Sequence, residues 1–271
     1  MAQQEVDEGV RKEIWTGMIP VCITLAKNEV ATQKPPVPYY CMIPRCTYYP
    51  LLMKEVKEHF LPATVQRVDE AWLSYRGEPL RWNRFFGVLF DLFGNDSLEL
   101  PWTLVVHFQG YPADKLFKRP TEETVKTHFF QSVKEANFLK FGTGSEMSSA
   151  LLPDEQTQLW QSVVDCSYAR FWEVNTKLAP KQFSAIPVRI LQPNSPFIQF
   201  PFCESDANGE PYTLLSLLQE ALPDIFNNQN ESPDRYPKVV VQGICPPFNT
   251  PIVWLCSHCA HPDNFLYICI L

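Results

Sequence analysis

Apolar residues along the chain follow two patterns. Short, nearly continuous runs are typical of buried strands, and runs spaced three to four residues apart are typical of amphipathic helices. Over residues 1–110 these patterns predict a short helix, a strand pair, a helix, a strand, a turn with a short strand, and a final strand. Their positions, in that order, are residues 6–14, 20–26 with 39–43, 51–60, 71–76, 80–82 and 102–108.

The last third of the chain repeats this order of elements. A strand pair, a helix, a strand, a short strand after a proline-containing turn, and a final strand are predicted at residues 186–191 with 197–200, 213–222, 238–242, 252–255 and 264–270. A glycine followed by a tryptophan recurs in register, as Gly77 and Trp82 and again as Gly243 and Trp254. Because the spacings differ, the chain repeats an order of elements and not a tandem sequence.

This order is typical of the ubiquitin-like β-grasp fold, in which one helix crosses a mixed sheet whose first and last strands run parallel. We therefore predict an α+β protein with two ubiquitin-like β-grasp domains; two unrelated α+β units are the alternative. The sequence ends at Leu271 without a diglycine, so we do not expect the chain itself to be a ubiquitin-type modifier.

The region between the two copies predicts helices. Thr121 is a suitable N-cap because its hydroxyl can accept a backbone hydrogen bond, and the two glutamates that follow it favour the positive end of the helix dipole. This helical pattern runs to Phe141, before a linker at residues 142–145, and a second one extends from Asp154 to Leu178. The expected organisation is a short N-terminal helix, a first ubiquitin-like domain, a helix-rich domain and a second ubiquitin-like domain, at residues 1–14, 15–115, 116–180 and 185–271.

Composition narrows the class of function. A net charge of −7 and a pI near 5.3 argue against binding of nucleic acid. The N-terminus is polar and acidic, unlike a signal peptide. The longest stretch without charged residues, 239–262, contains too many prolines and polar residues for a membrane span. The nine scattered cysteines indicate free thiols, and we expect a cytoplasmic protein.

Two cysteines and two histidines near the C-terminus have the side chains of a zinc site: Cys256, His258, Cys259 and His261. The simpler interpretation is a pair of half-buried cysteines and two surface histidines beside a short strand. A cysteine–histidine nucleophile pair has no local signature in this sequence. We therefore expect no catalytic residues, no metal and no cofactor, and the role of these four residues stays open.

Lys134 lies on the polar side of the first predicted helix of the middle region. At 100° per residue it points about 180° away from Val125, on the side opposite the apolar face. The residues within about 40° of Val125 are Phe129, Ser132, Ala136 and Leu139. Phe130 and Phe138 flank Lys134 at i−4 and i+4. By itself this pattern describes a surface lysine in an apolar patch.

Separate motifs recur in a fixed order over nearly the whole chain. They are Pro38-Tyr-Tyr40, Pro44-Arg45, Gly77-Glu-Pro-Leu-Arg-Trp82, Leu89-Phe-Asp-Leu92, Leu100-Pro-Trp102, Val106-His-Phe108, Lys134-Glu-Ala136, Phe171-Trp172, Asn175, Lys177-Leu178, Pro196-Phe-Ile-Gln199, Thr250-Pro251, Trp254-Leu255 and Pro262-Asp-Asn-Phe-Leu266. Together they resemble the autophagy-related protein five family. Departures near residues 28–37, 141–155 and 227–237 affect loop lengths.

The resemblance implies a role for Lys134. In this family, the lysine of the Lys-Glu-Ala motif accepts an isopeptide bond from the C-terminal glycine of the ubiquitin-like modifier autophagy-related protein twelve. Activating and conjugating enzymes supply the catalysis, so the resemblance implies an acceptor and not an enzyme. It also implies two ubiquitin-like domains on either side of a helix-rich domain.

Further partners follow from the same resemblance. The conjugate is expected to bind the N-terminal helix of the coiled-coil autophagy protein sixteen, to be recruited to the isolation membrane, and to act as an E3-like factor. That factor promotes attachment of autophagy-related protein eight to phosphatidylethanolamine during autophagosome formation. Two alternatives remain: a β-grasp adaptor that only docks protein partners without being conjugated, and a zinc or thiol enzyme.

Overall fold

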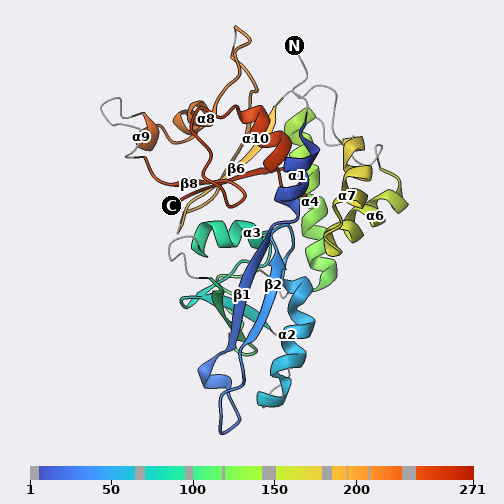
Figure 1. The fold of residues 1–271 in the computed structure, drawn as a ribbon, viewed down its shortest axis with the longest axis vertical. Helices are drawn as coiled ribbons and strands as arrows, with labels where there is room; N and C mark the ends of the chain where they lie inside the picture. Colours follow the sequence, from blue (N-terminus) through green and yellow to red (C-terminus); the bar gives the residue numbers. More distant parts are fainter. Residues whose placement is uncertain are drawn as a thin grey trace. The chain divides into compact units, whose positions relative to one another are not determined.

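A computed structural model describes residues 6–64, 71–94, 100–117, 120–141, 151–178, 185–193, 195–206, 208–227 and 236–271. The chain forms two compact units (Figure 1). The N-terminal unit is Gly17–His128, and the C-terminal unit combines Met1–Thr16 with Phe129–Leu271. The linker predicted at residues 142–145 lies outside the described residues.

The N-terminal unit contains a five-stranded mixed sheet in the order β2-β1-β5-β3-β4. Its strands are β1 (Met18–Leu25), β2 (Tyr39–Pro44), β3 (Trp72–Tyr75), β4 (Glu78–Pro79) and β5 (Trp102–His107). β1 pairs antiparallel with β2 and parallel with β5. The first and last strands therefore run parallel, as predicted for a β-grasp domain.

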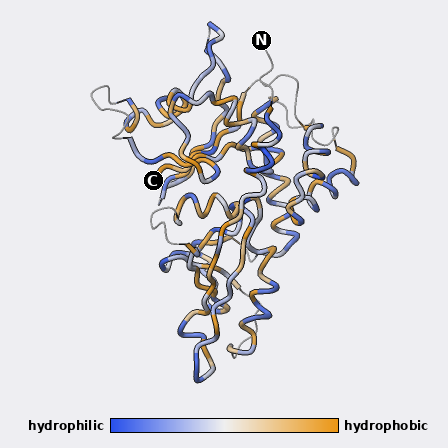
Figure 2. Tube along the Cα trace, in the orientation of Figure 1, coloured by the Kyte–Doolittle hydropathy of each residue, from blue (hydrophilic) through white to orange (hydrophobic). Residues whose placement is uncertain are grey.

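Alternation of side chains in the strands places one face of this sheet under helix α2 (Met53–Phe60). Ile19, Val21 and Ile23 of β1 are buried together with Val56 and Phe60 of α2. Figure 2 shows hydrophobic stretches of the chain in orange, alternating with hydrophilic stretches in blue. The apolar spacing along α2 explains why one helix covers this face of the sheet.

Two details of the N-terminal unit correct the predictions. The short strand after the turn is β4 at Glu78–Pro79, and not residues 80–82. The apolar residues that follow form helix α3 (Phe86–Leu89) and a π-helical turn (Phe90–Gly94). Asp91 in that turn accepts a 2.5 Å hydrogen bond from the buried guanidinium of Arg45. This ion pair joins Arg45 of the Pro44-Arg45 motif to Asp91 of the Leu89-Phe-Asp-Leu92 motif.

The C-terminal unit contains a four-stranded sheet in the order β7-β6-β9-β8, with the same connectivity. β6 pairs antiparallel with β7 and parallel with β9. The strands are β6 (Ile186–Leu191), β7 (Ile198–Phe202), β8 (Val239–Val240) and β9 (Leu266–Ile270), and the helices after β7 are α8 (Leu214–Ala221) and α9 (Pro223–Phe226). The repeated order of a strand pair, a helix, a strand and a final strand is confirmed, and the protein is α+β.

The predicted short strand at residues 252–255 is wrong, because these residues begin helix α10 (Ile252–Cys259). Pro251 precedes the first turn, where the missing N–H of a proline does little harm. Ile252, Leu255 and Cys259 are buried in the core of the sheet. Their spacing of three and four residues fits a helix, although a run this short is equally compatible with a strand.

Helices α4 (Glu122–Phe141), α6 (Pro153–Val164) and α7 (Tyr168–Asn175) form the middle of the chain. Thr121 caps α4, since its hydroxyl accepts a hydrogen bond from the backbone N–H of Thr124. The single helix predicted for residues 154–178 is wrong. The chain breaks at Cys166, which has a left-handed φ of 51°, and its carbonyl accepts a 3.0 Å bond from the Trp15 indole.

Helix α1 (Glu8–Trp15) packs beside α10 in the C-terminal unit (Figure 1). The side chain of Asp7 caps α1, and the backbone N–H of Asp7 donates to Nε2 of His258 at 3.0 Å. At the other end, Trp15 lies against Phe171, with a ring separation of 4.6 Å. These contacts explain why a short helix of weak intrinsic stability forms here. Among the described helices, none is long and apolar enough to cross a membrane.

Candidate functional site

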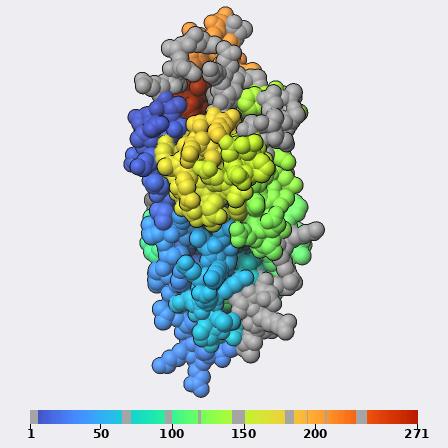
Figure 3. Space-filling view, turned by 90° about the vertical axis from the view of Figure 1, so that its right-hand side faces the viewer, coloured from blue at the N-terminus to red at the C-terminus, as the bar shows by residue number. Residues whose placement is uncertain are grey.

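The side chain of Lys134 is exposed in the C-terminal half of α4, as the helical pattern predicts. Figure 3 shows α4 beside α6 and α7 on one face of the molecule, and Phe129 of α4 contacts Trp160 of α6 at a ring distance of 5.7 Å. Phe138, four residues after Lys134, is 52% exposed, and Phe130 is half-buried. Phe130 and Phe138 therefore form an apolar patch beside the lysine.

The amine of Lys134 has no ion-pair partner among the residues that the structure describes. The helix neighbours at i±3 and i±4 are Phe130, Gln131, Asn137 and Phe138, and none of them is acidic. By contrast, the exposed Lys115 pairs with Glu78. The Lys134 amine is thus presented without a carboxylate on its own helix face.

Arg189 of β6 contacts α4 on both sides of Lys134. Its Nη1 donates to the hydroxyl of Ser132 at 2.7 Å, and its Nη2 donates to the carboxylate of Glu135 at 2.8 Å. Side chains alternate between the two faces of a strand, so Arg189 points to the face opposite Val188 and Ile190, which lie in the core under α8. We call Arg189, Ser132 and Glu135 the Arg189 clamp.

The clamp has its base in the sheet of the C-terminal unit. Arg189 lies opposite Gln199 on β7 and Tyr267 on β9 in the strand register, and it donates to both side chains at 2.7 Å. Asp263, with no exposed surface, accepts bonds from Ser132 and Tyr267 at 2.8 and 2.7 Å. One buried carboxylate therefore connects α4, β6 and the start of β9.

Sequence reasoning missed this network. A lone arginine inside the apolar run of β6 was the available signal, because a charged side chain in a buried strand needs a partner. Asp263 lies within a family motif, but nothing in the linear sequence pairs it with Ser132, 131 residues earlier.

Another lysine of α4, Lys140, is buried, with only 5% of its surface exposed. Burial lowers the pKa of its ammonium, while the nearby groups Cys256 and Asp263 act in the opposite direction. Lys134 and Lys140 lie six residues apart, so they point to different sides of the helix. Lys134 and Lys140 thus have opposite environments on one helix, and of these two only Lys134 is accessible to a macromolecular reagent.

The substitution Lys140→Met should change how stability depends on pH. A lowered pKa means that the folded state binds fewer protons than the unfolded state below pH 10.5. The free energy of unfolding of the natural protein should therefore rise relative to that of Lys140→Met as the pH increases from 7 to 10. Urea titrations at several pH values measure this difference, and a difference that stays constant with pH contradicts the prediction.

The cysteines and histidines considered for zinc are arranged as structural residues. Both nitrogens of His258 are engaged, since Nε2 accepts from the Asp7 N–H and Nδ1 bonds the carbonyl of Trp254 at 2.8 Å. Burial raises the pKa of Cys259 to about 12, which disfavours the thiolate that zinc requires. The expectation of surface histidines is wrong, because His258 and His261 are both buried. Among the described residues no cluster suits a metal ion.

A serine, a histidine and a glutamate meet in the N-terminal unit. The Ser74 hydroxyl lies 2.8 Å from Nε2 of His107, and Nδ1 lies 3.8 Å from the Glu29 carboxylate. Ser74 is only 2% exposed, and 3.8 Å exceeds hydrogen-bond range. Glu29 instead accepts the backbone N–H of Phe108 at 2.7 Å. This arrangement connects strands and does not offer a nucleophile to a substrate.

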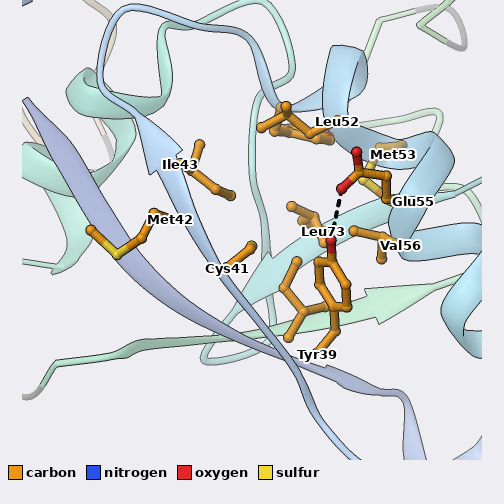
Figure 4. Close-up of a pocket in the computed structure, with 11 residues that line it drawn as sticks. Tyr39, Cys41, Met42, Ile43, Leu52, Met53, Glu55, Val56 and Leu73 are labelled. Atoms are coloured by element: carbon orange, nitrogen blue, oxygen red, sulfur yellow. Dashed lines mark hydrogen bonds between the residues drawn. The ribbon is translucent and has the colours of Figure 1, made fainter. Parts of the chain in front are cut away.

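A small cavity of about 60 Å³ lies between β2 and α2 in the N-terminal unit. The phenol of Tyr39 donates to Glu55 at 2.8 Å at this site (Figure 4). Burial and this hydrogen bond raise the pKa of Tyr39 to about 12. The remaining lining is mostly apolar, and nothing in it suggests catalysis.

Val56→Ile should stabilise the N-terminal unit by filling this cavity. Val56 is buried and lines the cavity, and one additional buried methylene contributes about 0.8 kcal/mol. Urea denaturation should show a higher free energy of unfolding. Val37→Ile is the matched control, because Val37 is 72% exposed and the same change should have almost no effect there. A destabilised Val56→Ile variant would mean that the cavity cannot accept the methylene.

Three family models match the chain in sequence order. They describe the UblA domain, the alpha-helical bundle region and the UblB domain of autophagy protein ATG5, at residues 14–108, 122–181 and 185–270. The matches cover the two β-grasp sheets and the helices between them. The protein thus has two ubiquitin-like domains on either side of a helical bundle region.

Curated relatives agree over nearly their whole length. Autophagy protein 5 of Dictyostelium discoideum is 27% identical, with 98% of this chain and 95% of that protein covered. Autophagy protein 5 of Drosophila melanogaster is 29% identical, with 97% of both covered. The crystal structure of Kluyveromyces marxianus Atg5 shares the fold, with a TM-score of 0.80, 22% identity, and coverage of 98% of this chain and 100% of that one. Because the three domain models and the relatives agree over the whole chain, the protein belongs to the autophagy protein ATG5 family and has a role in autophagy.

Proposed function

We propose that this protein is an autophagy scaffold that is covalently conjugated through Lys134 to a ubiquitin-like modifier. The observation that carries the proposal is the position of Lys134, whose exposed amine has no carboxylate partner among the described residues. A helix tied to the sheet by Arg189 holds this lysine. Lys134 also begins the Lys-Glu-Ala motif of the family to which the chain belongs.

The reaction needs little from the acceptor beyond an accessible amine. The neutral amine attacks the thioester carbonyl between the modifier's C-terminal glycine and the conjugating enzyme. An isopeptide C–N bond forms, the C–S bond breaks, the enzyme's thiol leaves, and the amine loses a proton. The activating and conjugating enzymes supply the thioester and the catalysis, so the chain has no catalytic residues of its own.

The conjugate then acts through partners. It binds the N-terminal helix of a coiled-coil autophagy protein, is recruited from the cytoplasm to the isolation membrane, and promotes lipidation of autophagy-related protein eight with phosphatidylethanolamine. Membership of the ATG5 family supports this part of the proposal. The matched ranges also support the domain limits 15–115, 116–180 and 185–271 after a helix at residues 1–14.

A reconstituted reaction tests the proposal against an adaptor that only docks partners. The purified chain is incubated with the modifier, its activating and conjugating enzymes and ATP. Mass spectrometry should show the addition of one modifier, and peptide mapping should place the branch at Lys134. Omission of the conjugating enzyme is the control. The absence of any adduct in an active enzyme system would favour the non-conjugated adaptor.

A further inference from the structure

We propose that Arg189 is a positioning residue for the acceptor amine, acting through the Arg189 clamp on α4. The inference rests on the proposed conjugation at Lys134. Arg189 lies on a different element from the lysine, and it does not touch the reacting atoms. Its two contacts on α4, Ser132 and Glu135, are the residues two before and one after Lys134.

The geometry of the clamp restrains rotation of α4 about its own axis. Ser132 and Glu135 lie about 60° apart on the helix, and a single rigid, planar guanidinium bonds both. A rotation of the helix by about 20° would displace an extended lysine amine by about 3 Å, since the side chain reaches well beyond the helix radius. Reactions between positioned groups are sensitive to displacements of about 1 Å.

The base of the clamp is restrained because each nitrogen of the Arg189 guanidinium donates to a side-chain acceptor. Nε bonds Gln199, Nη1 bonds Ser132 and Tyr267, and Nη2 bonds Glu135. The guanidinium carbon also lies 3.6 Å from the centre of the Phe265 ring. An ammonium group cannot reproduce this set of contacts, because it lacks the planar fork.

The contact between Arg189 and Glu135 can be removed with little effect on the stability of the fold. The Glu135 side chain is 55% exposed, and exposed ion pairs contribute little to stability. A substitution at Glu135 therefore removes one contact of the clamp while leaving the buried contacts of Arg189 with Asp263 and Tyr267 in place. Any effect on conjugation would then not come from loss of the fold.

The test measures the rate of conjugation of the full chain over a range of acceptor concentrations up to saturation, so that kcat and KM are separated. Glu135→Ala should lower kcat about fivefold with KM within about twofold, since positioning and not binding is impaired. Glu135→Gln should stay within about twofold of the natural protein, because its amide oxygen still accepts from Nη2. Gln131→Ala is the control: Gln131 is exposed, lies three residues before Lys134, and should have no effect.

A double-mutant cycle identifies Arg189 as the residue through which Glu135 acts. Arg189→Lys keeps a positive charge next to Asp263 but cannot bridge Ser132 and Glu135, so its kcat should fall as in Glu135→Ala. Adding Glu135→Ala to Arg189→Lys should then have no further effect. A purely structural role would lower the melting temperature and leave kcat per folded molecule unchanged.

The outcomes separate this inference from the proposed function. Normal kcat in Glu135→Ala, equal losses in Gln131→Ala, or additive losses in the double variant would overturn the positioning role while Lys134 remains the acceptor. Conjugation that persists in Lys134→Arg would overturn the proposed function and, with it, the positioning role. A non-additive loss of kcat, together with retained activity of Glu135→Gln, supports Arg189 as the positioning residue.

Discussion

Lys134→Arg should abolish formation of the covalent conjugate while the protein still folds. Arginine keeps the positive charge and most of the aliphatic stem, and it has a helix propensity similar to that of lysine. Its guanidinium stays protonated at any workable pH and cannot attack a thioester. Because Lys134 is exposed and has no ion-pair partner among the described residues, the substitution removes no described contact. A reconstituted conjugation reaction, read by the shift of one modifier mass, measures the effect.

Lys126→Arg is the matched control for this substitution. Lys126 lies on the same helix eight residues earlier, outside the Lys-Glu-Ala motif, and its variant should be conjugated as well as the natural protein. Lys134→Arg should still bind a peptide from the N-terminal helix of the coiled-coil partner, which demonstrates an intact fold. If the Lys134→Arg variant gains one modifier mass at the natural rate, another lysine is the acceptor.

Asp263→Ala should destabilise the C-terminal unit by about 3–5 kcal/mol, as expected when one partner of a buried ion pair is removed. Asp263 is the fully buried counterion of Arg189 and accepts hydrogen bonds from Ser132 and Tyr267. Its loss leaves a buried guanidinium whose one charged partner among the described residues is the half-exposed Glu135. Hydrogen exchange of β6, β9 and α4 should accelerate strongly, because these elements share the network.

We expect this loss of stability only for removal of a buried carboxylate, and not for removal of an exposed one. Asp154→Ala is the control, because Asp154 is exposed in the first turn of α6 and its removal should cost at most about 1 kcal/mol. Strand β1 of the N-terminal unit provides an internal reference for hydrogen exchange. Equal destabilisation by the two substitutions would show that the Asp263 network contributes no more than a surface charge.

Elements with a clear period were predictable from the sequence. The strand of residues 20–26 and the helix of residues 51–60 have the patterns of buried strand and amphipathic helix, and β1 and α2 occur there. The helix at residues 252–259 was not predictable, since a short apolar run is compatible with either structure. Propensity also missed the break at Cys166, where a hydrogen bond from Trp15 to the Cys166 carbonyl favours the turn.

The sequence by itself determined the α+β class, the repeated β-grasp order and the exposure of Lys134, because these follow from local periodicity along single strands and helices. Only the tertiary structure decided which buried polar groups meet. Arg189, Ser132 and Asp263 come from three distant parts of the chain, and their contact results from strand register and the packing of α4 on the sheet. Lys140 shows the same limit: its charge predicts the surface, whereas the packing of α4 buries it beside Asp263. Local pattern fixes which way a side chain points along its own element, but burial and pairing depend on what lies opposite.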